Sequence, residues 1–326
     1  MKKLLIPFVV VFSLNAYAFE NYKLEGNGTA NDPFLVTSAD DLSFIANKVN
    51  SADESYTKAY YLQTNNIVIN AQIGDEESYS VWTPIGTAEN PFQGVYNGGR
   101  NTISGIYIND SNAEHQGIFG CNDGEIKYLG LTNSYINART FIGGICGENR
   151  GDISFCYNEG TIVGVFYVGG ICGENNLNVQ YCYNIGNIHG AGPVSCVGGI
   201  AGTNIIMTDA EGNTSEYNAC IQNCYNAGNI SCTESTYVGG ICGMDNYGII
   251  KYCYNSGIVS GYAISSQYYI SDELFYDNQI CNSTDPRAIP LPTANMTKTA
   301  LFSDDNWEFV DGYYPQLKNM VHPINA

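Results

Sequence analysis

The sequence contains few basic residues. Its 326 residues include 13 Lys and Arg against 32 Asp and Glu, which gives a formal net charge of −19. Between Thr140 and Pro286, Arg150 and Lys251 are the only basic residues. Proteins that bind nucleic acid neutralise its phosphates with Lys and Arg. The composition therefore argues against a nucleic-acid partner and is typical of an acidic, exported protein.

Histidine and long apolar segments are also scarce. The three histidines, His115, His189 and His322, are scattered, and the zinc-protease pattern His-Glu-x-x-His does not occur. No regular spacing of Asp recurs from which a calcium site could be built. We therefore predict no metal and no cofactor.

An apolar run at the N-terminus predicts a secretory signal peptide over residues 1–18. Lys2 and Lys3 precede the run Leu4–Leu14, and the small-x-small sequence Ala16–Ala18 follows it. A run of this length is too short to span a bilayer. We expect a secreted or cell-surface protein with no membrane span after signal removal.

What the sequence has in abundance is a repeat. Gly-Gly-Ile-Cys-Gly occurs at Gly143–Gly147, Gly169–Gly173 and Gly239–Gly243, and a fourth copy, Gly198–Gly202, has Ala201 in place of cysteine. Each copy is followed by Cys-Tyr-Asn, and Gln116–Gly120 fits the same pattern one unit earlier. Self-similarity at a period of 20–50 residues predicts stacked units that bury a continuous core.

The runs within a unit are too short and too rich in glycine for helices. Strands that pair with the equivalent strands of the next unit give an all-β parallel solenoid. We predict an N-terminal cap and first coils over 19–110, a repeat array over 111–264 with an insertion at 204–223, and a C-terminal cap over 265–326. In the N-terminal cap, Ser38 and Asp41 form a capping box for one short helix.

Twelve cysteines in an exported chain would normally suggest disulfides. Ala201 replaces one of them, which favours small packed side chains in a narrow core. Neighbouring parallel strands are nevertheless about 4.8 Å apart, a distance that a disulfide tolerates, so bridges remain an alternative. Cys121, Cys196, Cys220, Cys232 and Cys281 lie outside the repeat positions, and Cys220 or Cys232 could pair. The predicted core cysteines are Cys146, Cys156, Cys172, Cys182, Cys224, Cys242 and Cys253.

Aromatic residues flank the second column of cysteines. Since side chains alternate along a strand, these neighbours point outward when the cysteines point inward. Aromatic rows suit sugar rings or a protein partner, although such rows also stack for stability. The asparagine after each tyrosine forms a further column that can hydrogen-bond along the stack. The candidate ligand-binding residues are Phe155, Tyr157, Tyr181, Tyr183, Tyr225, Tyr252 and Tyr254.

Two carboxylates give an alternative, enzymatic interpretation. Glu148 and Glu174 occupy equivalent positions in successive units, and a glycosidase needs two carboxyl groups about 5–9.5 Å apart. Repeated solvated turn residues explain the same pattern more simply. We therefore predict no catalytic residue and keep this pair as the alternative.

Several short sequence motifs resemble those of the GLUG-motif family of bacterial exported and surface proteins. They are the repeat itself, Trp82–Gly86 followed by Pro91–Gly94, Thr102–Gly105, and the closing Gly312–Pro315 after Trp307. The resemblance implies a right-handed parallel β-helix of the pectin-lyase type but no activity, because these repeats occur in adhesin-like proteins and in non-catalytic parts of larger proteins. We expect a non-catalytic scaffold for adhesion or recognition that binds a glycan or a host or extracellular protein. A glycosidase and a purely structural surface protein are the alternatives.

Overall fold

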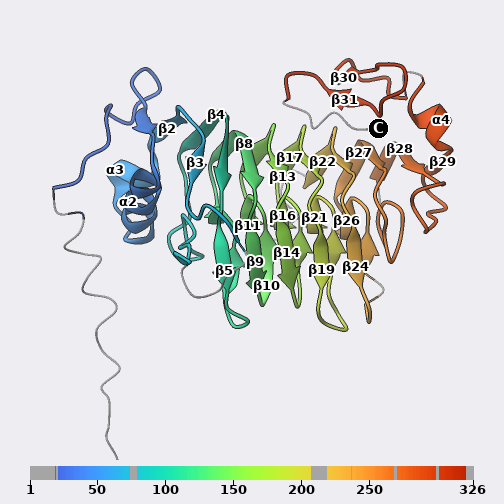
Figure 1. Ribbon diagram of the computed structural model, residues 1–326, viewed down its shortest axis with the longest axis horizontal. Coiled ribbons are helices and arrows are strands. Elements are labelled where there is room, and N and C mark those ends of the chain that lie inside the picture. Colours follow the sequence, from blue (N-terminus) through green and yellow to red (C-terminus); the bar gives the residue numbers. More distant parts are fainter. Residues whose placement is uncertain are drawn as a thin grey trace, which may run out of the picture.

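The computed structural model describes residues 19, 21–73, 79–206, 219–235, 237–267, 270–298 and 301–320. The predicted signal peptide and most of the predicted insertion lie outside these residues. The chain forms a parallel β-helix whose coils stack along the long axis of the molecule (Figure 1). This confirms the predicted fold class.

Three five-stranded parallel sheets run along the repeat array. The first contains β6 (Glu114–Gln116), β10 (Thr140–Gly143), β15 (Val168–Gly169), β20 (Val197–Gly198) and β25 (Val238–Gly239). The second contains β7 (Phe119–Asn122), β11 (Cys146–Asn149), β16 (Cys172–Asn175), β21 (Ala201–Ile205) and β26 (Cys242–Asn246). The third contains β5 (Tyr107–Asn109), β9 (Tyr135–Ala138), β14 (Thr161–Gly164), β19 (Ile188–Gly190) and β24 (Ile230–Cys232).

A 14-stranded sheet extends from the N-terminal region to the last coil. Its strands are β1 (Phe34–Val36), β2 (Tyr60–Gln63), β3 (Ile67–Val68), β4 (Val95–Ser104), β8 (Glu125–Thr132), β12 (Asp152–Ser154), β13 (Tyr157–Asn158), β17 (Asn178–Gln180), β18 (Tyr183–Asn184), β22 (Cys220–Gln222), β23 (Tyr225–Asn226), β27 (Ile249–Asn255), β28 (Ile270–Asp277) and β29 (Ile289–Leu291). An antiparallel pair, β30 (Trp307–Glu308) and β31 (Gln316–Leu317), forms a separate small sheet.

Equivalent residues of successive units lie directly beside one another. Cys146 pairs with Cys172, Cys172 with Ala201, and Ala201 with Cys242. The seven predicted core cysteines are all fully buried. All twelve cysteines lie in the described part of the chain, and each is a free thiol. The packed-thiol interpretation therefore agrees with the structure, and a repeat in register explains why alanine can replace one thiol.

Two ladders of buried asparagines run inside the stack. In the first ladder each side-chain amide donates to the oxygen of the next rung at 2.6–2.9 Å, through Asn122, Asn149, Asn175, Asn204 and finally Asp245. The second ladder joins Asn158, Asn184, Asn226 and Asn255 at 2.7–2.8 Å. The second was predicted from Cys-Tyr-Asn, whereas the first was not. Both run in one direction, with the donor on the N-terminal side of each contact.

The N-terminal end of the stack is closed by α2 (Ala39–Asn50) and the short α3 (Glu54–Thr57) (Figure 1). The predicted capping box is present, because Asp41 N donates to Ser38 Oγ and Ser38 N donates to Asp41 Oδ2. Leu42, Phe44 and Ile45 are buried in the main core. A helix in this position covers a sheet edge that would otherwise be open to another chain.

Asn97-Gly98 is a sequence typical of a hairpin turn and predicts one between two strands, but this prediction is wrong. The chain continues through this position as the single strand β4, which pairs in parallel with β8 on both sides of a register shift between Asn97 and Asn101. Gly99 and Arg100 adopt positive φ angles of 61° and 65°. The extra residues are therefore absorbed as a bulge, and the strand does not reverse.

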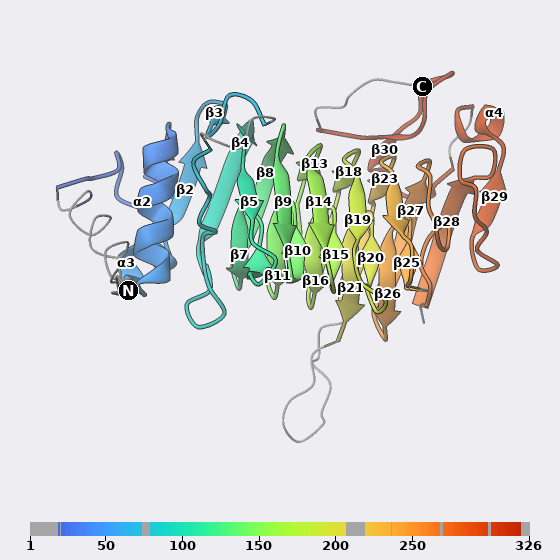
Figure 2. The same cartoon turned by 60° about the horizontal axis from the view of Figure 1, so that its bottom comes forward.

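The C-terminal residues extend the stack and then return along one side of it. β28 pairs with β27, and β29 pairs with β28. After α4 (Thr293–Met296), the segment with β30 and β31 lies beside the 14-stranded sheet near β22 and β27 (Figures 1 and 2). The predicted cap thus covers a lateral face as well as the last coil.

Candidate functional site

Four of the predicted ligand-binding tyrosines form one stacked column. The ring centroids of Tyr157, Tyr183, Tyr225 and Tyr254 are 4.9–5.0 Å apart from rung to rung, and the ring planes differ by less than 10°. Tyr183, Tyr225 and Tyr254 are only 1%, 4% and 1% exposed. The prediction that these three contact a ligand is therefore wrong.

The returning C-terminal segment buries these tyrosines. Phe302, Trp307 and Leu317 form a second apolar core with the column, separate from the core inside the coils. The Tyr254 hydroxyl donates to the carbonyl oxygen of Pro315 at 2.9 Å. The side chains point out of the coil, as alternation predicts, but the chain itself covers them. Sequence periodicity contains no signal for this contact between residues about sixty positions apart.

Two of the other predicted aromatic residues, Phe155 and Tyr181, belong with Tyr128 to a second column that is partly exposed. Tyr128, Phe155 and Tyr181 stack with centroids 4.7–4.8 Å apart. All three, and Tyr252 in a later coil, have φ angles of 53–54°. This left-handed conformation is rare for aromatic residues and turns the chain sharply before each inward cysteine or leucine. We call Tyr128, Phe155 and Tyr181 the aromatic ladder; its ring faces contact one another, so the ring edges face outward.

Asn223 interrupts this column at the equivalent position, also with a positive φ angle. Its side-chain oxygen accepts a hydrogen bond from Trp307 Nε1 at 2.8 Å, and its amide donates to Asp304 Oδ2 at 3.3 Å. A small polar residue at this rung therefore makes room for the C-terminal segment and holds it. Tyr252, one rung further, has Lys251 Nζ 5.7 Å from its ring centroid.

The alternative catalytic pair lies in neighbouring rungs, as predicted. Glu148 in β11 pairs with Glu174 in β16. Burial raises the pKa of Glu174, and the charge of Glu148 raises it further despite hydrogen bonds from Asn176 and Thr203. Burial alone would also raise the pKa of Glu148, but the hydrogen bond from His115 and the charge of Arg150 outweigh it and lower the pKa. Two adjacent carboxyl groups thus have pKa values shifted in opposite directions.

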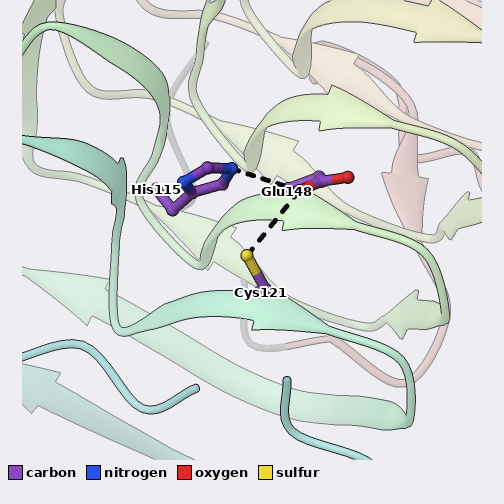
Figure 3. A group of neighbouring side chains, drawn as sticks. All are labelled: His115, Cys121 and Glu148. Carbon is purple, nitrogen blue, oxygen red and sulfur yellow. Dashed lines mark hydrogen bonds and ion pairs between the residues drawn. The ribbon is translucent and has the colours of Figure 1, made fainter. Parts of the chain in front are cut away.

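Glu148 is held by three side chains, two from the preceding coil and one that follows its own strand. His115 Nε2 lies 3.2 Å from Glu148 Oε2, and the Cys121 thiol lies 3.7 Å from the same oxygen. Arg150 Nη1 lies 3.5 Å from the other oxygen, Oε1, while Arg150 Nε contacts Asp123 Oδ1 at 2.7 Å. Figure 3 shows His115 and Cys121 both directed toward Glu148. A solvated turn residue would not have this many partners.

Sequence reasoning did not bring His115 and Cys121 together. His115 belongs to β6 and has a positive φ angle of 54°, with its ring stacked on Phe141 at 4.7 Å. Cys121 belongs to β7 and occupies the outward position that Glu148 holds in the next coil. A signal was present in the alignment of the units, because both residues depart from the repeat in the same coil.

A hollow of about 390 Å³ opens beside His115. The loop 83–89, Asn50 and the residues of β6 line it. Asn50 fixes the loop, because its side-chain oxygen accepts from Gly86 N at 2.7 Å and its amide donates to Pro84 O at 3.0 Å. The His115 side chain is 19% exposed and that of Glu148 is 15% exposed, so solvent reaches the cluster.

No family model matches the chain. Halomucin from Haloquadratum walsbyi is 32% identical over 145 residues, which are 43% of this chain and 2% of halomucin. A provisionally named Gly-rich membrane protein from Evansella cellulosilytica is 31% identical over 134 residues, 39% of this chain and 14% of that protein. The chain therefore spans only a small part of the curated relatives that it matches.

The fold is also that of a crystal structure from Bacteroides ovatus, of a protein provisionally named an immunoglobulin A1 protease. The TM-score is 0.66 at 19% identity, and the alignment covers 90% of this chain and 94% of the other. At this identity the likeness shows a shared β-helix fold alone. Among the described residues, no helix has the length and apolar character needed to cross a membrane.

Proposed function

We propose that this protein is a GLUG-type, non-catalytic β-helix scaffold that acts in adhesion or recognition outside the cell or at its surface. The observation that supports this best is the uninterrupted stack itself, in which equivalent residues pair from coil to coil. Such a stack displays the same side chains at regular intervals along one face, which suits repeated weak contacts with an extended partner. A glycan or an extracellular protein fits this description.

The aromatic ladder contains two of the predicted binding residues that stay partly exposed, Phe155 and Tyr181, together with Tyr128. All three are partly exposed, although Tyr181 also packs against the second apolar core, whereas Tyr183, Tyr225 and Tyr254 are buried in that core. Arg100 lies 5.6 Å from the centroid of the Tyr128 ring at one end of the ladder. Ring edges, hydroxyl groups and one guanidinium together offer apolar contact with polar tips. We assign partner contact to this ladder.

The repeat itself supplies substitutions that test this assignment. Asn223 occupies the ladder position in one coil with a φ angle of 51°, so Phe155→Asn and Tyr181→Asn preserve the backbone conformation. Tyr247→Asn is the matched control, because Tyr247 also has a positive φ angle and is 59% exposed. A glycan and extracellular-matrix screen on the purified chain would identify a partner. Binding should then fall at least tenfold in the double variant and stay unchanged in the control. Equal binding by the wild type, the double variant and the control would show that the aromatic ladder does not contact the partner.

A glycosidase is the second candidate function. It is favoured by the opposed pKa shifts of Glu148 and Glu174, since an acid catalyst needs a raised pKa and its partner a lowered one. Hydrolysis of a broad glycan panel, abolished by Glu174→Gln, would support it. Wild-type protein that releases no sugar from the panel would end this alternative.

A further inference from the structure

We propose that His115, Cys121 and Glu148 form a binding site for a zinc ion. Their ligand atoms, an imidazole nitrogen, a thiol sulfur and a carboxylate oxygen, all lie within 4.8 Å of one another. Zinc bonds of about 2.0–2.3 Å in a tetrahedron place neighbouring ligand atoms roughly 3.5 Å apart. The side chains therefore need only small rotations to close around an ion (Figure 3).

The donor set selects the kind of metal. A thiolate and an imidazole with a single carboxylate suit zinc and related divalent transition ions. Calcium and magnesium instead take six or more oxygen ligands, which this cluster does not offer. Three protein ligands leave the fourth position of a tetrahedron for water or another small ligand. The hollow beside His115 gives access from solvent.

The surroundings hold the ligands and balance the charge. Phe141 stacks on His115 and sets the plane of its ring, and Arg150 binds Oε1 of Glu148, which leaves Oε2 facing the other two ligands. The thiol gives up its proton to solvent when the metal binds. Thiolate, Glu148 and Asp123 carry three negative charges and Arg150 one positive charge, so a divalent ion neutralises the group.

Comparison with the next coils shows that this combination is specific to one place. Strand register puts Phe141 where His115 lies and Glu148 where Cys121 lies, and Glu174 follows in the place of Glu148. One coil further, the corresponding residues are Tyr167, Glu174 and Thr203. His115 and Cys121 thus both differ from the residues at the equivalent positions of the next coils, and both face the carboxylate of Glu148. A fold that needed only packing would not require both.

The same repeat provides variants that should fold. His115→Phe introduces the residue found one coil later at the same φ angle, and Cys121→Thr introduces the residue found further along the same column, Thr203. Matched controls are His189→Val and Cys220→Asn, which also introduce register equivalents, Val163 and Asn178. Circular dichroism spectra should be the same for all five proteins.

The test is zinc binding by the full chain after treatment with a chelator. Calorimetric titration with zinc sulfate and elemental analysis should give one zinc per wild-type chain, with affinity at least tenfold weaker in His115→Phe and Cys121→Thr and unchanged in both controls. Cobalt(II) should give a thiolate charge-transfer band in the wild type that Cys121→Thr lacks, and this readout decides the matter if His115→Phe does not fold. Failure of the wild type to bind zinc, or equal binding by Cys121→Thr, would overturn the proposal.

Discussion

Replacing Asn184 by Asp should destabilise the protein more than the same change at Asn255. Asn184 lies in the middle of its ladder, where its amide donates to Asn226 Oδ1 at 2.8 Å and to Gly186 O at 3.0 Å. Asn255 is the last rung, and its amide donates to Gly257 O at 3.0 Å and to the Cys281 thiol, whose sulfur is a weak acceptor. A carboxylate accepts from the preceding rung as well as an amide does, but it cannot donate to the next one.

The expected losses follow from these contacts. Each lost hydrogen bond costs about 1 kcal/mol, so Asn184→Asp forfeits about 2 kcal/mol and Asn255→Asp about 1 kcal/mol. At both positions a buried carboxylate without a cation adds a further penalty, which the group reduces by keeping its proton. In the middle of the ladder the carboxylate also faces the oxygen of Asn226. We expect the two variants to differ by at least about 1 kcal/mol at neutral pH.

Urea unfolding followed by circular dichroism measures this difference. Because burial raises the pKa of the new carboxyl group in the folded state, its folded form binds the proton more tightly than the unfolded chain does. The deficit of Asn184→Asp relative to the wild type should therefore shrink as the pH falls toward 4. Equal losses at the two positions would refute the inferred direction of the ladder. A deficit that does not change with pH would refute the burial of the new carboxyl group.

Three further outcomes follow from the packing. Trp307→Ala should lower the stability of the docked C-terminal segment by about 3–5 kcal/mol. Hydrogen exchange should therefore rise in residues 301–320 and at Tyr254 but not in the early coils, and exchange that rises everywhere would contradict this. Since burial raises the pKa of Glu174, its ionised form costs stability above its folded pKa. Glu174→Gln should thus raise the urea midpoint at pH 7 and give no gain below pH 4, whereas an equal gain at both would count against it. Cys224→Ala should cost less than about 2 kcal/mol, as Ala201 suggests. The seven core thiols, unlike the partly exposed Cys220, should resist alkylation in native wild type until it unfolds, and rapid labelling of these seven would show that they are accessible.

The coil period, the inward cysteines and one asparagine ladder could be predicted because they repeat. Each unit must present the same residue to its neighbours, so periodicity alone assigns Cys156 to the interior and predicts that Asn158 hydrogen-bonds along the stack. The helix start at Ser38 was equally accessible, since a capping box is a local signal. The first ladder was not predicted because no constant motif marks its asparagines. The residue before the asparagine is Glu or Thr in some units and Cys121 in another.

The coverage of the tyrosine column could not be predicted, because it depends on a non-periodic segment that docks from far along the chain. Nothing in the sequence near Tyr225 indicates that Trp307 will lie against it. The cluster at Glu148 was not predicted from the sequence for a different reason. His115 and Cys121 come from two strands of one coil and Glu148 from the next coil. Only a position-by-position comparison of the units, which shows that His115 and Cys121 both depart from the repeat, would have linked them.

The one-way asparagine ladders also determine how such a protein can grow. A duplicated unit with asparagine at both ladder positions brings one donor and one acceptor, so it can be inserted between any two coils. If the same unit were added after Asp245, the side-chain oxygen of its asparagine would face the Asp245 carboxylate, so two acceptors would meet. Duplications that lengthen the array are therefore tolerated within it and selected against beyond that coil, and related proteins should vary in length through added middle units.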